Sequence, residues 1–512
     1  MTDTAARTVR ECIERQAAAR PDAIYAVATE TGAHLTFGDI ARGARATAAF
    51  LRDIGLAPGD AVALVMPNGL GTLKLLLGAM HAGVAVTPVN LVSQPAQMRH
   101  VLHHGDCRAV FVAPEWEERV RGLLEGVSRP VAVVAADPDD AAWPEASDAT
   151  HEWPAPDPQA LALLMYTSGT TGVPKGVMLS QSNLAANAHA ICVEHALSAG
   201  DRVLGVLPLY HINAFAVTML APLASGGSVA LAPRFSAGRF WAQAAGRGCT
   251  WLNVVPTMIS YLLEGAEPER ADTLRLRFCR SASAALPPDH QRAFEGRFGI
   301  GVIETMGLTE TVAPSFSNPL DPQQRRIGSV GRASGCEARV IDAQFLPVAD
   351  GTTGEIAIRG PTVMRGYYKD ATATAAAFTP DGWLRTGDLG HRDADGFFFV
   401  TGRIKELIIK GGENIAPREI DEALLAHPAV LEAAAVGIPD RHYGQEILAC
   451  VVLRPASTCS EDELRAHCLA QLGAYKTPKS FRFVAELPRG PSGKVQRLKL
   501  LDLGDAAGDR AR

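Results

Sequence analysis

The amino-acid sequence predicts an α/β protein with a large N-terminal domain of layered sheets and helices and a smaller α+β C-terminal domain. In the first third of the chain, amphipathic segments with helical spacing alternate with short apolar segments, as in proteins that layer helices on a sheet. Near Gly402 this alternating pattern gives way to a short region of mixed helical and strand-like segments. The length of 512 residues suits about three folding units, which can merge into two domains.

The N-terminal domain, residues 1–402, is expected to follow a regular order of elements. Val9, Cys12, Ile13 and Ala17 recur at helical spacing, so a helix docked on the core is expected near the start. Helical spacing then covers 37–51 and 70–81, and short apolar strands are expected at 61–66, 84–89 and 109–112. A polar, Pro-rich stretch over 137–158 indicates a surface connection, and an apolar run over 161–166 leads into a loop of Gly and Thr.

The C-terminal domain has its own set of expected elements. Helices are expected at 417–425 and after Ser460, where Glu463 follows three residues later and completes a capping box. Strand-like runs occupy 430–436, 447–453 and 481–487. Roughly 100 residues of this kind are enough to fold as a separate domain.

Charge and cysteine content exclude several classes of protein. The 49 Lys and Arg residues against 55 Asp and Glu residues give a net charge of −6, which disfavours nucleic acid as a partner. The 9 cysteines are scattered, odd in number and without CxxC spacing, so we expect free thiols in a reducing cytoplasm rather than disulfides or zinc. An uncharged stretch over 203–233 is interrupted by Pro208 and Pro222 and contains a histidine and an asparagine, which indicates buried strand, turn and helix rather than a membrane span.

The strongest single motif is YTSGTTGVPKG at 166–176. It follows a buried strand and contains three glycines, which let the backbone fold round an anion. Its hydroxyls, its N–H groups and Lys175 supply the donors and the charge that a polyphosphate needs. It is not a Walker A loop, because Gly176 rather than Ser or Thr follows Lys175. The motif therefore predicts a phosphate-binding loop.

With that loop, the chain resembles the ANL superfamily of adenylate-forming enzymes over essentially its whole length. LPLYH at 207–211 is similar to the family's aromatic-gate segment, and ETMGLTE at 304–310 to its adenine and magnesium segment. WLRTGDLG at 383–390 is similar to the ribose-binding loop. GRIKELIIKGGENIAP at 402–417 resembles the hinge with the loop of a rotating domain, and PSGKVQR at 491–497 the loop of a catalytic lysine.

The resemblance implies how the chain handles ATP and Mg²⁺. Glu310 would hold Mg²⁺, and Thr309 would donate to the α-phosphate. Lys494 would contact both the carboxylate and the α-phosphate region, which neutralises charge as two anions approach. Asp388 would accept hydrogen bonds from the ribose hydroxyls, with Arg403 as a further donor. The residues implied for binding ATP and CoA are Thr167, Ser168, Gly169, Thr170, Thr171, Lys175, Ser283, Ala284, Thr305, Met306, Asp388, Arg403, Lys410, Gly411 and Gly412.

Transfer of the acyl group to coenzyme A is implied as the second half-reaction. In the family the small domain is mobile and rotates about a hinge, here residues 403–405 with Lys405 at the pivot. The rotation of residues 406–512 would remove Lys494 and bring the loop of Lys410, Gly411 and Gly412 to the pantetheine. A thiol is already partly ionised near neutral pH, so no strong base is needed for this step.

The acid substrate is expected to be mostly apolar. No Asp follows Phe215 in the gate segment, where relatives that activate amino acids hold the substrate ammonium. His211 is implied both as a catalytic residue and as part of the pocket. The pocket residues implied by the resemblance are His211, Ile212, Phe215, Val254, Val255, Ser281 and Gly307, beside Thr305.

Three positions depart from the family pattern: Met306 replaces a tyrosine that stacks on adenine, Ala285 replaces a proline, and Gln181 replaces a histidine. The function expected is that of an AMP-forming acid–CoA ligase. Two alternatives stay open, namely adenylation with transfer to the phosphopantetheine of an acyl carrier protein, and a non-enzymatic protein that binds nucleotide or acyl adenylate.

Overall fold

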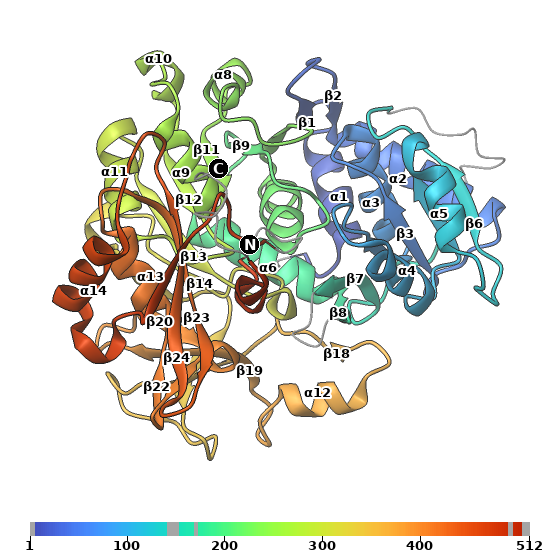
Figure 1. The fold of residues 1–512 in the computed structure, drawn as a ribbon. Coiled ribbons are helices and arrows are strands. Elements are labelled where there is room, and N and C mark those ends of the chain that lie inside the picture. Colours follow the sequence, from blue (N-terminus) through green and yellow to red (C-terminus); the bar gives the residue numbers. More distant parts are fainter. Residues whose placement is uncertain (1–5, 141–152, 168–172, 490–494, 504–512) are drawn as a thin grey trace.

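A seven-stranded sheet builds the side of the N-terminal domain that carries the phosphate-loop motif (Figure 1). The computed structural model describes residues 6–140, 153–167, 173–489 and 495–503. In spatial order the strands are β18 (Gly366–Tyr367), β8 (Lys175–Ser180), β7 (Leu161–Thr167), β4 (Ala85–Pro88), β3 (Ala61–Val65), β5 (Ala109–Val112) and β6 (Ala132–Ala135). The strands from β7 to β6 are parallel, whereas β8 runs antiparallel to β7.

A nine-stranded sheet builds the other side. Its order is β15 (Arg332–Ala333), β14 (Phe316–Ser317), β13 (Val302–Met306), β12 (Phe278–Ser281), β11 (Trp251–Val254), β9 (Arg202–Gly205), β10 (Ser228–Leu231), β1 (Ile24–Ala28) and β2 (His34–Thr36). The six strands from β13 to β1 are parallel to their neighbours. Their carboxyl ends therefore share one edge, which is where open α/β sheets bind ligands.

Helices cover and connect these sheets. The helices are α1 (Val9–Ala19), α2 (Phe37–Asp53), α3 (Leu70–His81), α4 (Pro95–His104), α5 (Glu117–Leu123), α6 (Gln181–Glu194), α7 (Ala221–Ser225), α8 (Phe240–Gly246), α9 (Pro256–Glu264), α10 (Arg270–Thr273), α11 (Pro288–Phe298) and α12 (Ala371–Ala377). Helix α3 is buried along its whole length, and η2 (Ala214–Leu220), a π-helical segment, is buried as well. Capping boxes at Thr36 and Ser180 begin α2 and α6.

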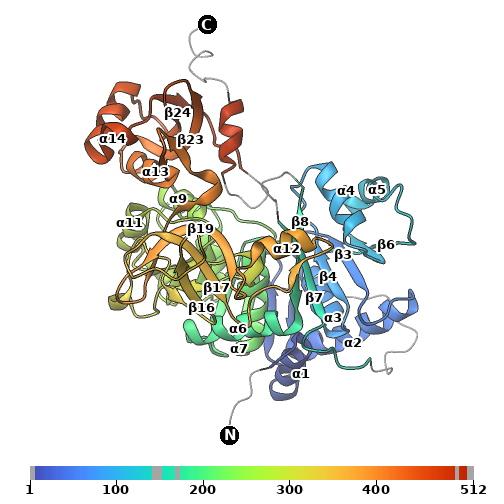
Figure 2. The same cartoon turned by 90° about the horizontal axis from the view of Figure 1, so that it is seen from below.

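A third, antiparallel sheet leads to the C-terminal domain. It contains β16 (Glu337–Ile341), β17 (Gly354–Arg359), β19 (Leu384–Arg392) and β20 (Phe398–Arg403). The segment η5 (Ile404–Glu406) follows β20 directly. Figure 2 shows the elements after it as a separate lobe beside β19 and α9.

The C-terminal lobe packs two helices on a five-stranded sheet. Its elements are β21 (Ile408–Lys410), β22 (Glu413–Ile415), α13 (Pro417–Leu425), β23 (Val430–Asp440), β24 (Gly444–Leu453), α14 (Glu461–Lys476), β25 (Ser480–Phe483) and η6 (Arg497–Asp502). Ile420, Leu424, Ile447 and Phe481 are buried in its core. The lobe contacts the N-terminal domain where Arg418 donates to the Val400 carbonyl, at 2.7 Å.

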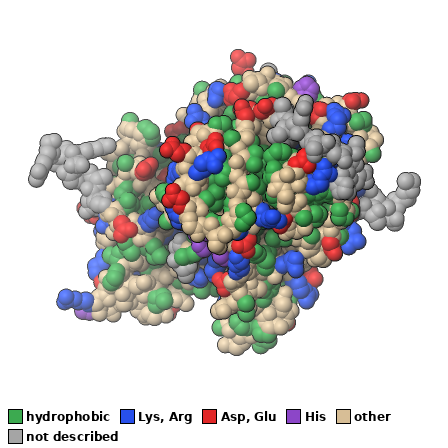
Figure 3. Space-filling model, turned by 90° about the vertical axis from the view of Figure 1, so that its right-hand side faces the viewer, with side chains coloured by type: hydrophobic (Ala, Val, Ile, Leu, Met, Phe, Trp, Pro, Cys, Tyr) green, Lys and Arg blue, Asp and Glu red, His purple; other side chains and the backbone are tan. Residues whose placement is uncertain are grey.

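The α/β fold class and most expected elements are confirmed. The last expected strand ends at Phe483 rather than Leu487, and residues 141–152 of the expected surface connection lie outside the described residues. The uncharged stretch 203–233 contains β9, η2, α7 and β10, and among the described residues no helix is long and apolar enough to cross a membrane. All nine cysteines are free thiols, as expected. On the face in Figure 3, acidic and basic side chains are interspersed.

Candidate active site

The carboxyl edge of the nine-stranded sheet collects several residues that the sequence singled out. Val254 ends β11, Ser281 ends β12 and Met306 ends β13, so all three lie at this edge. Gly307 follows Met306 at a close approach, since a Cβ there would lie 2.6 Å from the Ala313 Cα. Glycine at position 307 therefore lets the Thr309–Glu310 segment turn back over the sheet.

The two ends of the phosphate-loop motif face each other across an antiparallel pair. Thr167 is the register partner of Lys175, at the ends of β7 and β8. The Lys175 ammonium lies 5.0 Å from the centre of the Tyr367 ring, within the range of a cation–π contact. Ser168, Gly169, Thr170 and Thr171 lie outside the described residues.

Glu310 is joined to this motif by Tyr367, which the sequence analysis did not single out. The Tyr367 hydroxyl donates to Glu310 Oε1 at 2.8 Å, so Lys175 and Glu310 contact the same tyrosine. Thr309 and Glu310 lie in η3 (Thr309–Thr311), and the Met364 N–H donates to the Glu310 carbonyl at 2.8 Å. These bonds hold the Glu310 carboxylate at the hydroxyl of the tyrosine whose ring Lys175 faces.

The donor set at Glu310 suits magnesium that arrives with ATP. Within the described ranges, no group of three or more His, Cys, Asp or Glu side chains could hold a metal ion without help. Mg²⁺ commonly binds through one or two carboxylates together with water and substrate phosphates. One carboxylate joined through Tyr367 to Lys175 therefore fits this ion as the partner of a nucleotide.

Asp388 and Arg403 form an ion pair that leaves one carboxylate oxygen available. They are register partners on β19 and β20, and Arg403 Nε donates to Asp388 Oδ1 at 2.7 Å. The charge of Asp388 is the main cause of the raised pKa of Arg403, with smaller contributions from Glu310 among others. Asp388 Oδ2 is buried and finds no hydrogen-bond partner among the described residues. A buried acceptor of this kind fits the hydroxyls of a ribose.

The residues implied for adenine lie beside this edge. Ser283 has φ +76°, a left-handed conformation uncommon for a residue other than glycine, and its Oγ accepts from Asn213 Nδ2 at 3.2 Å. Ala284 is exposed, and Thr305 is buried, with its hydroxyl donating to the Ser281 carbonyl at 3.3 Å. Met306 is half-buried and packs against the core of the third sheet, where Phe316 is its register partner.

We expect Met306→Tyr to tighten the apparent binding of ATP by about three-fold to thirty-fold. A tyrosine ring stacked on adenine contributes about 1 to 3 kcal/mol, of which methionine recovers part by dispersion. The KM values for ATP and for the acid, measured on the same variant, check this result. An unchanged KM for ATP with a raised KM for the acid would show that Met306 fills space beside the acyl group instead.

The implied acyl pocket is only partly brought together. Ile212 and Phe215 are buried in the core between the two large sheets, whereas Val254 packs with α8, α9 and α11 in a different hydrophobic cluster. Val255 is half-buried next to it, and Ser281 Oγ is buried without a partner among the described side chains. His211 is half-buried, with its ring 4.9 Å from that of Tyr210. The predicted pocket therefore mixes residues from both faces of the nine-stranded sheet.

Gln181, one of the departures from the family pattern, has a structural role. Its amide accepts from the Val9 N–H at 3.0 Å and donates to the Met80 carbonyl at 2.8 Å. It is fully buried at the start of α6 and ties α1 and α3 to it. Ala285, the other small departure, is exposed.

The loop implied for CoA is a tight hairpin between β21 and β22. Gly411 and Gly412 have φ of +54° and +87°, as the two central residues of a type I′ turn require. Lys410 is 6% exposed, and its ammonium pairs with Glu446 at 3.0 Å and donates to the Tyr475 carbonyl at 3.0 Å. Lys410 therefore fixes the base of the hairpin within the C-terminal lobe.

The structure describes the position of Lys405 but not that of Lys494. Lys405 is exposed in η5, between β20 and β21, and its role as a hinge stays a prediction, as do the domain boundaries. Lys494 lies outside the described residues, but Arg489 and Val495, which flank residues 490–494, pair as an antiparallel bridge. Arg497 anchors the following residues through ion pairs with Asp421 and Glu406.

We expect Lys405→Pro to impair one half-reaction much more than the other. Proline fixes φ near −65° and removes an N–H, so it restricts the change of backbone angles that a hinge needs. ATP–pyrophosphate exchange reports adenylation, and thioester formation from synthetic acyl adenylate reports transfer. Equal loss in both assays, with the circular dichroism spectrum unchanged, would contradict a rotating domain.

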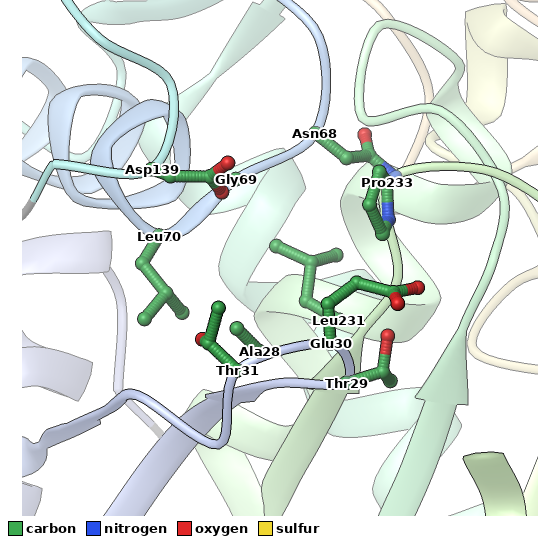
Figure 4. A pocket seen from close by; sticks show the side chains of 10 residues that line it. All are labelled: Ala28, Thr29, Glu30, Thr31, Asn68, Gly69, Leu70, Asp139, Leu231 and Pro233. Atoms are coloured by element: carbon green, nitrogen blue, oxygen red, sulfur yellow. The ribbon is translucent and has the colours of Figure 1, made fainter.

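The pocket in Figure 4 lies apart from these residues. It is lined by residues of β1, of the turn after it and of the start of α3, among them Thr29, Glu30 and Asn68. Asn68 donates to the carbonyls of Leu207 and Ala232 and accepts from the Leu209 N–H. These bonds join the segment before α3 to the segments that follow β9 and β10. None of the implied site residues lines this pocket.

Comparison with known proteins places the chain in a family. Residues 13–368 match the model of the AMP-binding enzyme family, and residues 419–494 match that of the AMP-binding enzyme C-terminal domain. The sulfoacetate–CoA ligase of Cupriavidus necator is 59% identical over 97% of both chains. The oxalate–CoA ligase of Arabidopsis thaliana is 34% identical over 88% of this chain and 90% of its own.

A solved structure shares the fold over nearly the whole chain. The crystal structure of ATP-bound MatB from Rhodopseudomonas palustris superimposes with a TM-score of 0.89 at 30% identity, and covers 97% of this chain and 98% of its own. The match includes both the N-terminal domain and the C-terminal lobe. The resemblance to adenylate-forming enzymes is thereby confirmed, and the chain belongs to the AMP-binding enzyme family.

Proposed function

We propose that this chain joins a small carboxylic acid with a second acidic group to coenzyme A, at the expense of ATP, with sulfoacetate as the first candidate. The activity as an AMP-forming acid–CoA ligase rests on the family and on relatives named as CoA ligases. The substrate class is supported by two of those names, since sulfoacetate and oxalate each carry two acidic groups. The identity of 59% over 97% of the chain carries this proposal.

This substrate class differs from the mostly apolar acid predicted from the sequence. The comparisons do not confirm that apolar preference. The absence of an Asp after Phe215 argues against a substrate ammonium, but it does not distinguish an apolar acid from a dianion.

In the first half-reaction an oxygen of the acid attacks the α-phosphorus of ATP, and the bond to pyrophosphate breaks. Lys175 and Lys494 offset the negative charge as the two anions approach. Mg²⁺ that accompanies ATP supplies further charge neutralisation, with Glu310 as its protein ligand. Asp388 Oδ2 accepts from the ribose, so the nucleotide is held while the bond forms.

In the second half-reaction the CoA sulfur attacks the acyl carbon, and the bond from that carbon to AMP breaks. The thiol proton passes to solvent. AMP is a good leaving group, so the residues of this chain have to position the thiol rather than activate it strongly. An acyl carrier protein as acceptor stays a prediction, as does a location in the cytoplasm.

A panel of acids tests the proposed function. AMP release is measured with ATP, Mg²⁺ and sulfoacetate, with and without CoA, and beside it with oxalate, acetate, propionate and benzoate. We expect CoA-dependent AMP release that is greatest with an acid of two acidic groups. Replacing CoA with a carrier protein in the same assay distinguishes the two acceptors, and ATP–pyrophosphate exchange distinguishes an enzyme from a binding protein.

A further inference from the structure

A buried arginine without a carboxylate partner lies beside the predicted acyl pocket. Arg280 on β12 is fully buried, with 0% of its surface exposed. Its Nη1 donates to Asn213 Oδ1 at 2.7 Å and to Asn253 Oδ1 at 2.8 Å. Its Nε and Nη2 are buried and have no hydrogen-bond partner among the residues that the structure describes.

The two unpartnered nitrogens form one edge of the guanidinium. Nε and Nη2 carry parallel N–H bonds, and this edge takes a carboxylate or a sulfonate through two hydrogen bonds at once. Nη1, which both asparagines occupy, lies on the other side of the group. The asparagines therefore orient the arginine and leave the edge that binds anions unused.

No described acidic group compensates this charge. Burial lowers the pKa of Arg280 to about 9, and burial is its single cause, without any nearby carboxylate. The guanidinium is thus still mostly protonated at neutral pH. The neighbouring His195 adds no charge of either sign, because burial, and then the charge of Arg280, lower its pKa to about 3 and keep it neutral. Buried charges are normally paired, so an anion is the missing partner.

The position of Arg280 connects it with the substrate. It precedes Ser281, which ends β12 at the carboxyl edge of the sheet. Asn213, which orients it, stands two residues after His211 of the gate segment and donates to Ser283 Oγ at 3.2 Å. Asn253 is its register partner on β11. One hydrogen-bonded cluster thus joins the arginine to the segments that are implied to surround the acyl group and the adenine.

We propose that the Nε–Nη2 edge of Arg280 binds the second acidic group of the substrate, a sulfonate or carboxylate close to the carboxyl group that is activated. This inference rests on the proposed function and deepens it, because it makes one side chain responsible for the specificity for the acid substrate. Arg280 is a specificity residue that contacts the substrate, and Asn213 and Asn253 are positioning residues that orient it. An acid with one carboxyl group would leave the guanidinium edge unpaired, which disfavours such an acid.

The test compares sulfoacetate with propionate, which is of similar size but has a single acidic group. In Arg280→Met we expect kcat/KM for sulfoacetate to fall roughly 100-fold or more, while that for propionate changes by less than about threefold. Arg280→Lys keeps a charge but not the two parallel donors, so an intermediate loss is expected. Arg277→Met is the matched control and should keep the wild-type ratio, because Arg277 immediately precedes the same strand and pairs with Asp201 instead.

Binding of sulfoacetate, measured by calorimetry without CoA, separates this inference from the proposed function. Loss of that binding in Arg280→Met supports the site even if the wild-type enzyme turns over another acid faster. Equal loss for both acids in Arg280→Lys, or sulfoacetate binding unchanged in both variants, would overturn the assignment. Replacing a buried, unpaired charge by an apolar chain of similar length is commonly tolerated, so folding of Arg280→Met is expected. If it fails to fold, Arg280→Lys alone decides.

Discussion

In Lys494→Ala we expect the rate of adenylation to fall about 100-fold to 1,000-fold, while the rate of thioester formation from a supplied acyl adenylate stays unchanged. The lysine is implied to offset charge where carboxylate and α-phosphate meet, and losses of this size follow when one such group is removed. ATP–pyrophosphate exchange measures the first reaction. Synthetic acyl adenylate with CoA measures the second, which bypasses the step that needs the lysine.

The residues around Lys494 provide its control. Arg497 anchors the same segment through Asp421 and Glu406, and removal of the Lys494 side chain leaves these ion pairs in place. Arg489→Ala removes the ion pair with Glu432 at the other end of the segment but keeps Lys494, so its loss of exchange should be much smaller than that of Lys494→Ala. If Lys494→Ala slows thioester formation from acyl adenylate as much as it slows ATP–pyrophosphate exchange, the lysine does not act in adenylation alone.

Glu310→Gln should lower ATP–pyrophosphate exchange by roughly 100-fold or more and raise the Mg²⁺ concentration that the reaction needs. The amide keeps the shape of the side chain but removes the negative charge that would hold the ion beside the phosphates. Exchange rates measured over a range of Mg²⁺ concentrations check both effects.

Tyr367→Phe is the matched control for Glu310→Gln. It removes the hydroxyl that donates to Glu310 Oε1 but keeps the ring that faces Lys175. One hydrogen bond to a carboxylate is lost while the charge remains, so a decrease of at most about tenfold is expected. Exchange within threefold of wild type in Glu310→Gln at every Mg²⁺ concentration would argue that the ion is held elsewhere.

Local sequence signals predicted much of the fold. Alternating helical and strand periodicity located α2, α3, β3 and β5 within a few residues, because burial of one face fixes such patterns. Ser460 and Glu463 located the start of α14, since a capping box is a contact within one turn. The order of strands in the two large sheets depends on contacts between distant segments, which the periodicity does not contain.

The site was less predictable because its partners come from separate elements. Asp388 and Arg403 were singled out, yet their pairing depends on the register of β19 with β20. Tyr367 stands 57 residues from the glutamate that it contacts and belongs to none of the recognised motifs. Arg280 had one available signal, a charged residue inside the apolar strand FCRS, but only the structure shows that its partners are two asparagines and no carboxylate.

Formation of a CoA thioester from sulfoacetate is the measurement that tests the account most directly. Purified enzyme is mixed with ATP, Mg²⁺, CoA and sulfoacetate, and thioester and AMP are quantified together by mass spectrometry. We expect one AMP for each sulfoacetyl-CoA, and a much lower yield when propionate replaces sulfoacetate. AMP release without thioester, or no AMP release with any acid of the panel, would contradict the proposed function.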